Sequence, residues 1–270
     1  MKNLSEKKYW DSIYDNISSS KKTNPGIKDW LKNISRDYSN FVIWENILPK
    51  LLPKKSSLKI IEIGCAPGKY LLNFRKNFGY EPYGVEYSEK GCEITRDNFS
   101  KEGVSSSNII FADFFDNKFQ QNNFEKYDII FSRGFIEHYD DVHSVVKLHA
   151  DLIKKDGYVV VMIPNLNGLN RVLAKFLNKS SYDLHNLSIM DKKVYSDLFT
   201  KNGIEVMFCG YVGIFSVGLF NTDSKLKYLL YRILLILQRP FDLIFRVFLS
   251  KMDLGWKYTS PYLLFVGQKR

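Results

Sequence analysis

The chain has few cysteines, and their placement excludes two common kinds of scaffold. The three cysteines, Cys65, Cys92 and Cys209, are odd in number, far apart and never spaced as CxxC. Neither a disulfide framework nor a cysteine zinc site is therefore expected, and we predict no bound metal. Free thiols favour a reducing compartment, so we expect a cytoplasmic protein that can also lie peripherally on the inner face of a membrane.

The sequence also lacks a secretory signal and internal repeats. Its first ten residues carry three lysines and no apolar stretch, which argues against a signal peptide. The absence of a repeat argues against a solenoid. With 45% hydrophobic and 25% charged residues, the composition is that of an ordinary folded domain.

Positive charge is present in excess. The net charge is +10, and the excess lies in residues 1–60 and 221–251. Phosphorylated substrates, anionic lipid and nucleic acid all suit such basic segments. A solvated, lysine-rich surface that binds nothing accounts for the charge equally well.

Strands and helices alternate from residue 58 onward. Each expected strand is a short apolar run, which predicts a parallel sheet covered by helices on both faces. We expect strands at 58–63, 82–86, 108–111, 127–131, 158–163, 204–209 and 262–266. We expect helices at 37–51, 69–78, 88–102, 141–154 and 191–202, a turn at 155–157 and an irregular stretch at 164–190.

These elements predict a doubly wound α/β fold with one domain and an arm. Residues 1–57 form an N-terminal helical arm or lid, with a short helix around Tyr9, Trp10 and Tyr14. Residues 58–270 form the domain, with substrate insertions at 164–190 and 211–258.

A loop with the sequence EIGCAPG, residues 62–68, follows the first expected strand. Glycines at this edge of a sheet let the backbone approach a ligand closely. A phosphate-binding P-loop is excluded, because the glycine spacing is one residue short and Tyr70 follows the lysine. The dinucleotide pattern fits poorly, because Ala66 replaces its middle glycine and the third glycine is missing. An acidic residue two before a glycine, with another glycine four later, is the pattern that remains.

Polar residues end three further strands. Glu86 ends the second strand, where a carboxylate can accept both hydroxyls of a ribose. Asp113 and Phe114 follow the third strand. There the Asp113 carboxylate can accept a hydrogen bond from the amine of an adenine, and the Phe114 ring can pack on the adenine ring. Residues 132–138 follow the fourth. Ordinary acidic turns explain such a series of carboxylates less well than a common ligand does.

Together these motifs resemble class I S-adenosylmethionine-dependent methyltransferases over about residues 55–165. The resemblance implies a Rossmann-like, seven-stranded sheet whose last strand is antiparallel, and S-adenosyl-L-methionine as cofactor. Residues 9–11, Tyr-Trp-Asp, are similar to the N-terminal lid of small-molecule members. The cofactor residues implied are Glu62, Gly64, Cys65, Ala66 and Gly68 for the methionyl part, Glu86 for the ribose, Tyr87, Asp113 and Phe114 for the adenine, and Ser132 and Arg133 beside the methionine end.

Methyl transfer mainly requires alignment of acceptor and methyl group, although an oxygen acceptor gains from a general base. His138 follows the fourth strand and His185 lies in the 164–190 stretch, so both are candidate catalytic residues. A histidine that only orients its loop explains His138 as well. His143 and His149 fall on an expected helix, where surface or packing roles are expected.

The apolar segment 226–251 carries arginines at 232, 239 and 246, and their seven-residue spacing keeps them near one helical face. Pro240 is expected to split the segment into two helices. Neither reaches the length of about 20 apolar residues that spans a bilayer. They lie on a membrane surface, cap the substrate cleft or pair two subunits in a homodimer.

Residues 163–171, IPNLNGLNR, with His185 and Asn186 later, resemble methyltransferases of bacterial surface-polysaccharide gene clusters. The resemblance implies O-methylation of a sugar or phosphate-linked group, on an anionic small-molecule or glycan acceptor. Alternatives are a lipid or quinone methyltransferase at the membrane surface, an RNA methyltransferase and a non-catalytic cofactor-binding module. No (N/D)PPY sequence follows the fourth strand, so a nucleic-acid partner is not expected.

Overall fold

The structure is a computed structural model of the 270-residue chain. It describes residues 3, 9–11, 14, 37–249, 252 and 254–270. Most of the 1–57 arm therefore lies outside the described residues. Tyr9, Trp10, Asp11 and Tyr14 are helical, at the place where a short helix is expected.

The core of the fold is one seven-stranded sheet in the order β3-β2-β1-β4-β5-β7-β6. The first five strands are parallel, and β7 runs antiparallel to both of its neighbours. The predicted sheet and its antiparallel last strand are confirmed. The strands are β1 (Lys59–Ile63), β2 (Glu81–Glu86), β3 (Ile109–Phe111), β4 (Tyr127–Arg133), β5 (Ile153–Pro164), β6 (Ile204–Val212) and β7 (Tyr262–Lys269).

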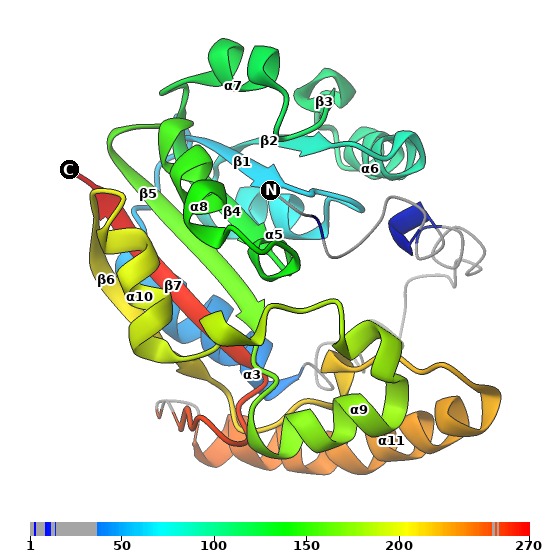
Figure 1. Ribbon diagram of the computed structural model, residues 1–270. Coiled ribbons are helices and arrows are strands. Elements are labelled where there is room, and N and C mark those ends of the chain that lie inside the picture. The colour runs from blue at the N-terminus through cyan, green and yellow to red at the C-terminus, as the bar shows by residue number, and fades with distance from the viewer. Residues whose placement is uncertain (1–2, 4–8, 12–13, 15–36, 250–251, 253) are drawn as a thin grey trace.

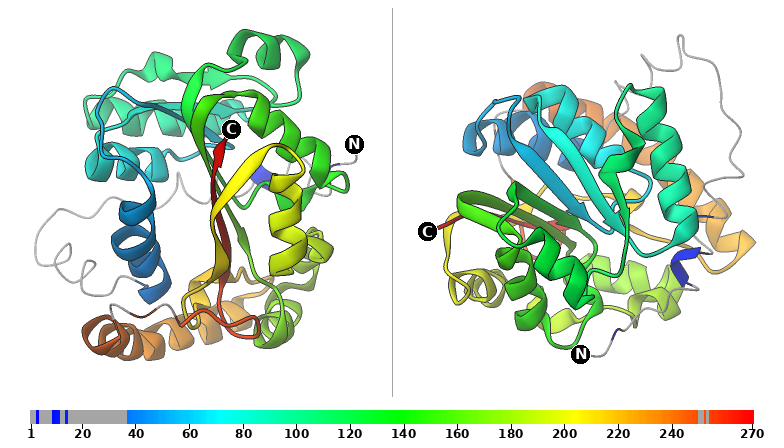
Figure 2. Two further views of the ribbon diagram at one scale, coloured as in Figure 1. Left: turned by 90° about the vertical axis from the view of Figure 1, so that its left-hand side faces the viewer. Right: turned by 90° about the horizontal axis from the view of Figure 1, so that it is seen from above.

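Helices cover both faces of the sheet (Figure 2), because its strands are apolar on both sides. One core contains side chains of α7, α8, α9 and α10, and the other contains those of α3, η1, α4, α5 and α6. The helices are α3 (Tyr38–Phe41), η1 (Val42–Ile47), α4 (Leu48–Leu51), α5 (Lys69–Phe78), α6 (Glu89–Lys101), α7 (Asn117–Asn123), α8 (Val142–Asp151), α9 (Gly168–Tyr182), α10 (Lys192–Thr200) and α11 (Lys225–Phe248).

The expected helix at 37–51 is present as α3, η1 and α4 in succession, and the side chain of Asp37 caps its first turn. Its central part, η1, is a π-helix. Val42, Ile43 and Trp44 are buried against the sheet. The C-terminal part of the segment assigned to the arm thus belongs to the core of the fold.

Three expectations were wrong. The 164–190 stretch is not irregular, because it holds α9, whose apolar Ala174 and Leu177 face the core. Residues 155–157 do not form a separate turn but lie within β5, as an irregularity with φ of +63° at Asp156 and a register shift against β4. Pro240 does not split the 226–251 segment, since α11 continues through it. The proline lies on the solvent side of α11, while the opposite side is held to the protein by other residues.

Helices α9 and α11 lie together across the end of the sheet toward which β5 points (Figure 1). The backbone N–H of Asp223, just before α11, donates to the Leu177 carbonyl of α9 at 3.3 Å. The two insertions therefore meet, although β6 and α10 separate them in the sequence.

Candidate functional site

The loop of residues 64–68 joins β1 to α5 with two left-handed glycines. Gly64 has φ of +69° and Gly68 has φ of +82°, a conformation that costs little only for glycine. A Cβ on Gly68 would lie 2.8 Å from Thr95 Cγ2, so this position also lacks room for a side chain. The loop therefore turns sharply and leaves its backbone beside the cavities described next.

Two cavities adjoin this loop. The first, here called the donor cavity, has a volume of ≈ 160 Å³ and is lined by predicted residues Glu62, Gly64, Ala66, Tyr87 and Arg133. The second, here called the adenine cavity, has a volume of ≈ 340 Å³ and is lined by Gly64, Tyr87, Asp113 and Phe114. Because Gly64, Tyr87, Phe135 and Tyr139 line both, the two cavities are adjacent. The sheet thus brings together side chains predicted at three successive strand ends.

Glu62 carries a buried carboxyl oxygen, Oε2, without a hydrogen-bond partner. Its burial raises the pKa of the carboxyl well above its usual range, and the Arg133 guanidinium opposes this rise. The Tyr87 hydroxyl, on the same cavity, also lacks a partner. Buried polar atoms rarely remain unpaired, so the cavity suits a ligand that carries polar groups. The methionyl and ribosyl parts of S-adenosylmethionine carry such groups.

Glu86 lies at the end of β2 and is covered by the N-terminal residues. The Tyr14 hydroxyl donates to Glu86 Oε2 at 3.2 Å, and the Ser88 N–H donates to Oε1 at 2.9 Å. Ser88 Oγ donates in turn to Asp11 at 2.6 Å. Asp11 and Tyr14 thus contact the chain at the end of β2, where the ribose is expected.

Two other predicted cofactor residues turn their side chains away from both cavities. Cys65 is buried against Gly84, and Ser132 Oγ is hydrogen-bonded to His149 Nε2 at 3.1 Å. They can meet a cofactor only through their backbone. His149 is a buried packing residue and His143 is exposed, in keeping with their expected roles.

A larger cavity of ≈ 430 Å³, here called the acceptor pocket, lies beside the donor cavity. Both are lined by Trp10, Tyr70, Arg133, Gly134 and His138. The acceptor pocket continues between α9 and the segment before α11, where its walls include Asn178, Ser181, Tyr182, Phe220 and Asn221. A molecule in this pocket would lie next to a molecule in the donor cavity.

The two candidate catalytic histidines meet in the acceptor pocket, with ring centroids 4.8 Å apart. Nδ1 of His138 contacts the Leu184 carbonyl at 2.9 Å, and Nδ1 of His185 contacts the Ser181 carbonyl at 2.9 Å. Burial lowers the pKa of His138 to about 3 and also lowers that of His185. Both rings are therefore neutral near pH 7, and His138 is a weak proton acceptor.

Arg133 places a fixed positive charge where the two cavities join. Its guanidinium donates to the Tyr262 hydroxyl at 2.8 Å and lies 4.7 Å and 4.8 Å from the ring centroids of Tyr70 and Tyr262. Cation–π contacts on two sides restrict its movement. It can pair with an anionic group of a ligand in either cavity.

Glu137 is the site residue that the sequence analysis missed most clearly. It is fully buried on the wall of the acceptor pocket, and neither carboxyl oxygen has a hydrogen-bond partner of normal geometry. Burial raises its pKa to about 8, against the nearby backbone N–H groups of Glu137 and Phe135 and the charge of Arg133. Its position directly before His138 was a usable signal. Tyr182 and Asn178 could not be found, because their segment was expected to be irregular.

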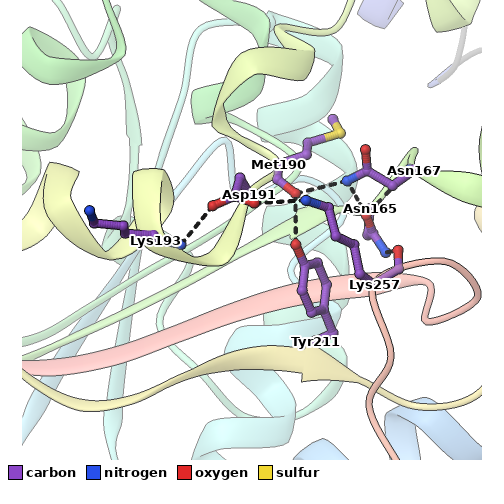
Figure 3. A network of polar contacts seen from close by, with 7 residues as sticks. All are labelled: Asn165, Asn167, Met190, Asp191, Lys193, Tyr211 and Lys257. Atoms are coloured by element: carbon purple, nitrogen blue, oxygen red, sulfur yellow. Dashed lines mark hydrogen bonds and ion pairs between the residues drawn. The ribbon is translucent and has the colours of Figure 1, made fainter.

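A polar network lies directly beside Pro164 and Leu166, which line the acceptor pocket (Figure 3). Asn165 Nδ2 donates to the Lys257 carbonyl at 2.9 Å, and Lys257 Nζ pairs with Asp191 Oδ2 at 2.7 Å. The Met190 carbonyl accepts from Asn167 Nδ2 at 2.8 Å and from the Tyr211 hydroxyl at 3.1 Å. The network ties the 164–190 insertion to β6 and to the segment before β7.

The chain is similar in sequence to known methyltransferases. A family model described as a methyltransferase domain matches residues 36–207. A probable cobalt-precorrin-6B C(15)-methyltransferase (decarboxylating) of Saccharolobus solfataricus is 28% identical over 189 residues, covering 68% of this chain and 90% of that protein.

Solved structures share the fold at low identity. Geranyl diphosphate C-methyltransferase from Streptomyces coelicolor A3(2) is 13% identical, with a TM-score of 0.56 over 86% of this chain and 79% of that chain. A possible histamine N-methyltransferase from Thermotoga maritima is 20% identical, with a TM-score of 0.53 over 90% of this chain and 94% of that chain. These enzymes are named for chemically different acceptors, so the likeness speaks for the fold and leaves the acceptor open.

Proposed function

Because the chain belongs to the family of S-adenosylmethionine-dependent methyltransferases, we propose that it methylates a hydroxyl of a sugar or phosphate-linked group in bacterial surface-glycan biosynthesis. S-adenosylmethionine, when bound, supplies a methyl group already activated by its sulfonium. The observation that carries the proposal is the acceptor pocket, which adjoins the donor cavity and has aromatic and polar walls.

The walls of the pocket suit a sugar that carries negative charge. Tyr9, Trp10 and Tyr182 offer aromatic faces on which the C–H face of a sugar ring can pack. Asn178 and Ser181 offer hydrogen bonds to hydroxyls. Arg133, beside them, can pair with a phosphate or carboxylate.

His138 and His185 face the acceptor under this proposal. Their neutral rings lie on the wall next to the donor cavity, where they can position a hydroxyl. A weak base removes little of the proton of the acceptor hydroxyl in the transition state. These residues therefore contribute to the rate mainly by aligning the hydroxyl with the methyl group.

Incubation of the purified protein with methyl-labelled S-adenosylmethionine and fractionated cell extract tests the proposal. Label is expected in the nucleotide-sugar or lipid-linked glycan fraction, and digestion should recover it as an O-methyl sugar. Label confined to simple lipids, quinones or RNA would overturn the glycan assignment while leaving methyl transfer intact.

A lipid or quinone acceptor at a membrane surface is a second candidate, and α11 favours it. More than half of the exposed large hydrophobic side chains among the described residues lie on this helix. Its other face is anchored: the Tyr38 N–H donates to Asp242 at 3.1 Å and the Val217 N–H to Gln238 at 2.6 Å. None of the described helices is long and apolar enough to cross a bilayer, so α11 would lie along the surface.

Charge around this apolar face suits anionic lipid. Asp242, the single acidic residue of α11, is buried, and α9 has none. Arg232 and Arg239 lie along one edge of the apolar face, where they can reach headgroups. A second copy of the chain fits less well, because a symmetric contact would bring these like charges together. The neighbouring helix α9 also exposes apolar side chains, Leu169, Val172 and Phe176. Lys227 of α11 lies over the Phe176 ring, 5.7 Å from its centroid.

Sedimentation with vesicles tests this second candidate. Wild-type protein is expected to bind vesicles containing phosphatidylglycerol and to bind neutral phosphatidylcholine vesicles less. The triple change Leu229→Gln, Ile233→Gln and Ile236→Gln should weaken binding roughly 100-fold, at about 1 kcal/mol for each partly inserted side chain. The matched control changes three exposed apolar residues elsewhere, Val194, Val206 and Met207, to Gln. Equal binding by both variants, or concentration-dependent dimerisation lost only in the α11 variant, would contradict membrane contact.

A further inference from the structure

We propose that Glu137, His138 and His185 form a binding site for a divalent transition-metal ion in the wall of the acceptor pocket. One candidate ligand atom from each residue lies within 4.8 Å of those of the other two. Ligand atoms placed 2.0–2.2 Å from one ion are roughly 3–4 Å apart. A small rotation of the side chains therefore brings the three atoms to coordinating distance.

The hydrogen bonds of the two histidines leave one nitrogen of each ring available. A carbonyl oxygen can only accept, so the contacts with Leu184 and Ser181 assign the ring proton of both histidines to Nδ1. Nε2 then carries a lone pair in each ring. A ring whose other N–H is held by a backbone carbonyl is the usual arrangement of a metal-ligating histidine.

Glu137 supplies an independent observation. Glu137 has 0% relative exposure, and neither carboxyl oxygen has a hydrogen-bond partner of normal geometry. The backbone N–H groups of Glu137 and Phe135 and the charge of Arg133 offset its burial only in part, because its pKa remains raised. Nearly all buried polar groups in proteins are paired with protein, water or an ion. A cation at this position would satisfy the carboxylate, and the carboxylate would balance part of the charge of the ion.

The scaffold around the three residues keeps them together although they come from distant segments. The Asn186 N–H donates to the Glu137 carbonyl at 2.7 Å, and Asn186 Nδ2 donates to the Tyr139 carbonyl at 3.0 Å. These bonds attach the segment after α9 to the turn after β4. The Trp10 ring covers His138 edge-on, with centroids 5.5 Å apart.

Two histidines and one carboxylate suit zinc or ferrous iron, and three protein ligands leave a position open for substrate. All three residues line the acceptor pocket, so an ion held by them would adjoin it. Under the proposed function, an acceptor oxygen would occupy the open position and be held next to the donor cavity. The use of the ion thus rests on the proposed function, whereas its binding does not. The site departs from the expectation, based on cysteine spacing, that the protein holds no metal.

Titration of chelator-treated full-length protein with Co²⁺ tests the site without turnover. One equivalent is expected to bind, with visible absorption bands that Zn²⁺ abolishes by displacement. Glu137→Gln and His185→Gln should each weaken Co²⁺ binding at least about 10-fold. His143→Gln, at an exposed histidine, should leave it unchanged.

S-adenosylhomocysteine binding, measured on the same preparations, shows whether each variant is folded. His185 is only partly buried, so its variant tests the proposal even where Glu137→Gln does not fold. Absence of the absorption bands in wild-type protein, or equal Co²⁺ affinity in wild type and His185→Gln, would overturn the site. Metal binding without methyl transfer to any glycan would instead overturn only the proposed function.

Discussion

The donor side and the acceptor side of this molecule are built in different ways. On the donor side, the predicted residues Glu62, Glu86 and Asp113 each lie within two residues of the end of β1, β2 or β3. The acceptor pocket joins the turn after β4 to α9, to the segment before α11 and to β7. Neighbouring parallel strands align the first set directly, whereas packing of distant segments is needed for the second.

This difference predicts that substitutions on the two sides affect different properties of the protein. Damage on the donor side should remove cofactor affinity and spare stability. Damage where α9 and α11 join the fold should lower stability and spare cofactor affinity.

The largest effect is expected on the donor side from Glu86→Gln. A neutral amide loses charge-assisted hydrogen bonds to ribose hydroxyls, each worth about 1.5–3 kcal/mol. The dissociation constant of S-adenosylhomocysteine should rise about 100-fold in isothermal titration calorimetry. Glu93→Gln, at an exposed position on α6, should bind as wild type does. An unchanged affinity in Glu86→Gln would show that Glu86 does not hold the ribose.

Gly168→Ala probes the acceptor side through its fold. Gly168 begins α9 with φ of +53°, and a Cβ there would overlap the backbone of Tyr258. We expect the free energy of unfolding in urea to fall by at least about 2 kcal/mol, from left-handed strain and the overlap together. Gly203→Ala is the matched control, because φ is +76° and nothing lies within 4 Å of its Cβ. It should lose only about 1 kcal/mol, and equal losses would show that the Tyr258 contact is unimportant.

The smallest effect concerns pH and the attachment of α11. Burial first, and then the neighbouring Asp37 carboxylate, raise the pKa of Asp242 from 3.8 to about 6, against hydrogen bonds from Tyr38 and Gln238 and the charge of Arg246. The folded state therefore binds this proton more tightly than the unfolded state does. The resulting stability is fully present below about pH 4 and is lost as the pH rises through about 6.

Thermal unfolding from pH 4 to 7 checks this expectation. Asp242→Asn should flatten that part of the profile, whereas Asp156→Asn, at an exposed position, should follow the wild type. If thermal stability changed with pH to the same extent in all three proteins, Asp242 would not be the cause of the pH dependence. Affinity for S-adenosylhomocysteine should not respond to Asp242→Asn, because α11 does not line the donor or adenine cavity.

Much of the donor side could be read from the sequence. The ends of the expected strands coincide with the observed ends or differ from them by at most five residues, since buried parallel strands are continuous apolar runs. Asp113 and Phe114 line a cavity because their place after a strand already puts them at the ligand edge of the sheet. The Tyr14 contact with Glu86 could not be read, because it joins residues 72 apart in the chain.

The acceptor side was read less well. Helix α9 was missed because asparagine and glycine obscure its apolar period. The expected break at Pro240 does not occur, because packing overrides the helix-breaking tendency of a single proline. The pairing of His138 with His185 was not foreseen either, although each was chosen by its place in the chain. Asn186, which holds their segments together, carries no signal that a single sequence reveals.

The amino-acid sequence by itself determined the sheet, the glycine loop and the carboxylates at the strand ends, because short-range periodicity and strand order place them. Only the tertiary structure decided which residues face one another across the acceptor pocket, that the Glu137 carboxyl is buried without a hydrogen-bond partner of normal geometry, and that α11 presents a continuous apolar face to its surroundings. These properties depend on which surfaces segments far apart in the chain remove from water, and no local pattern encodes that.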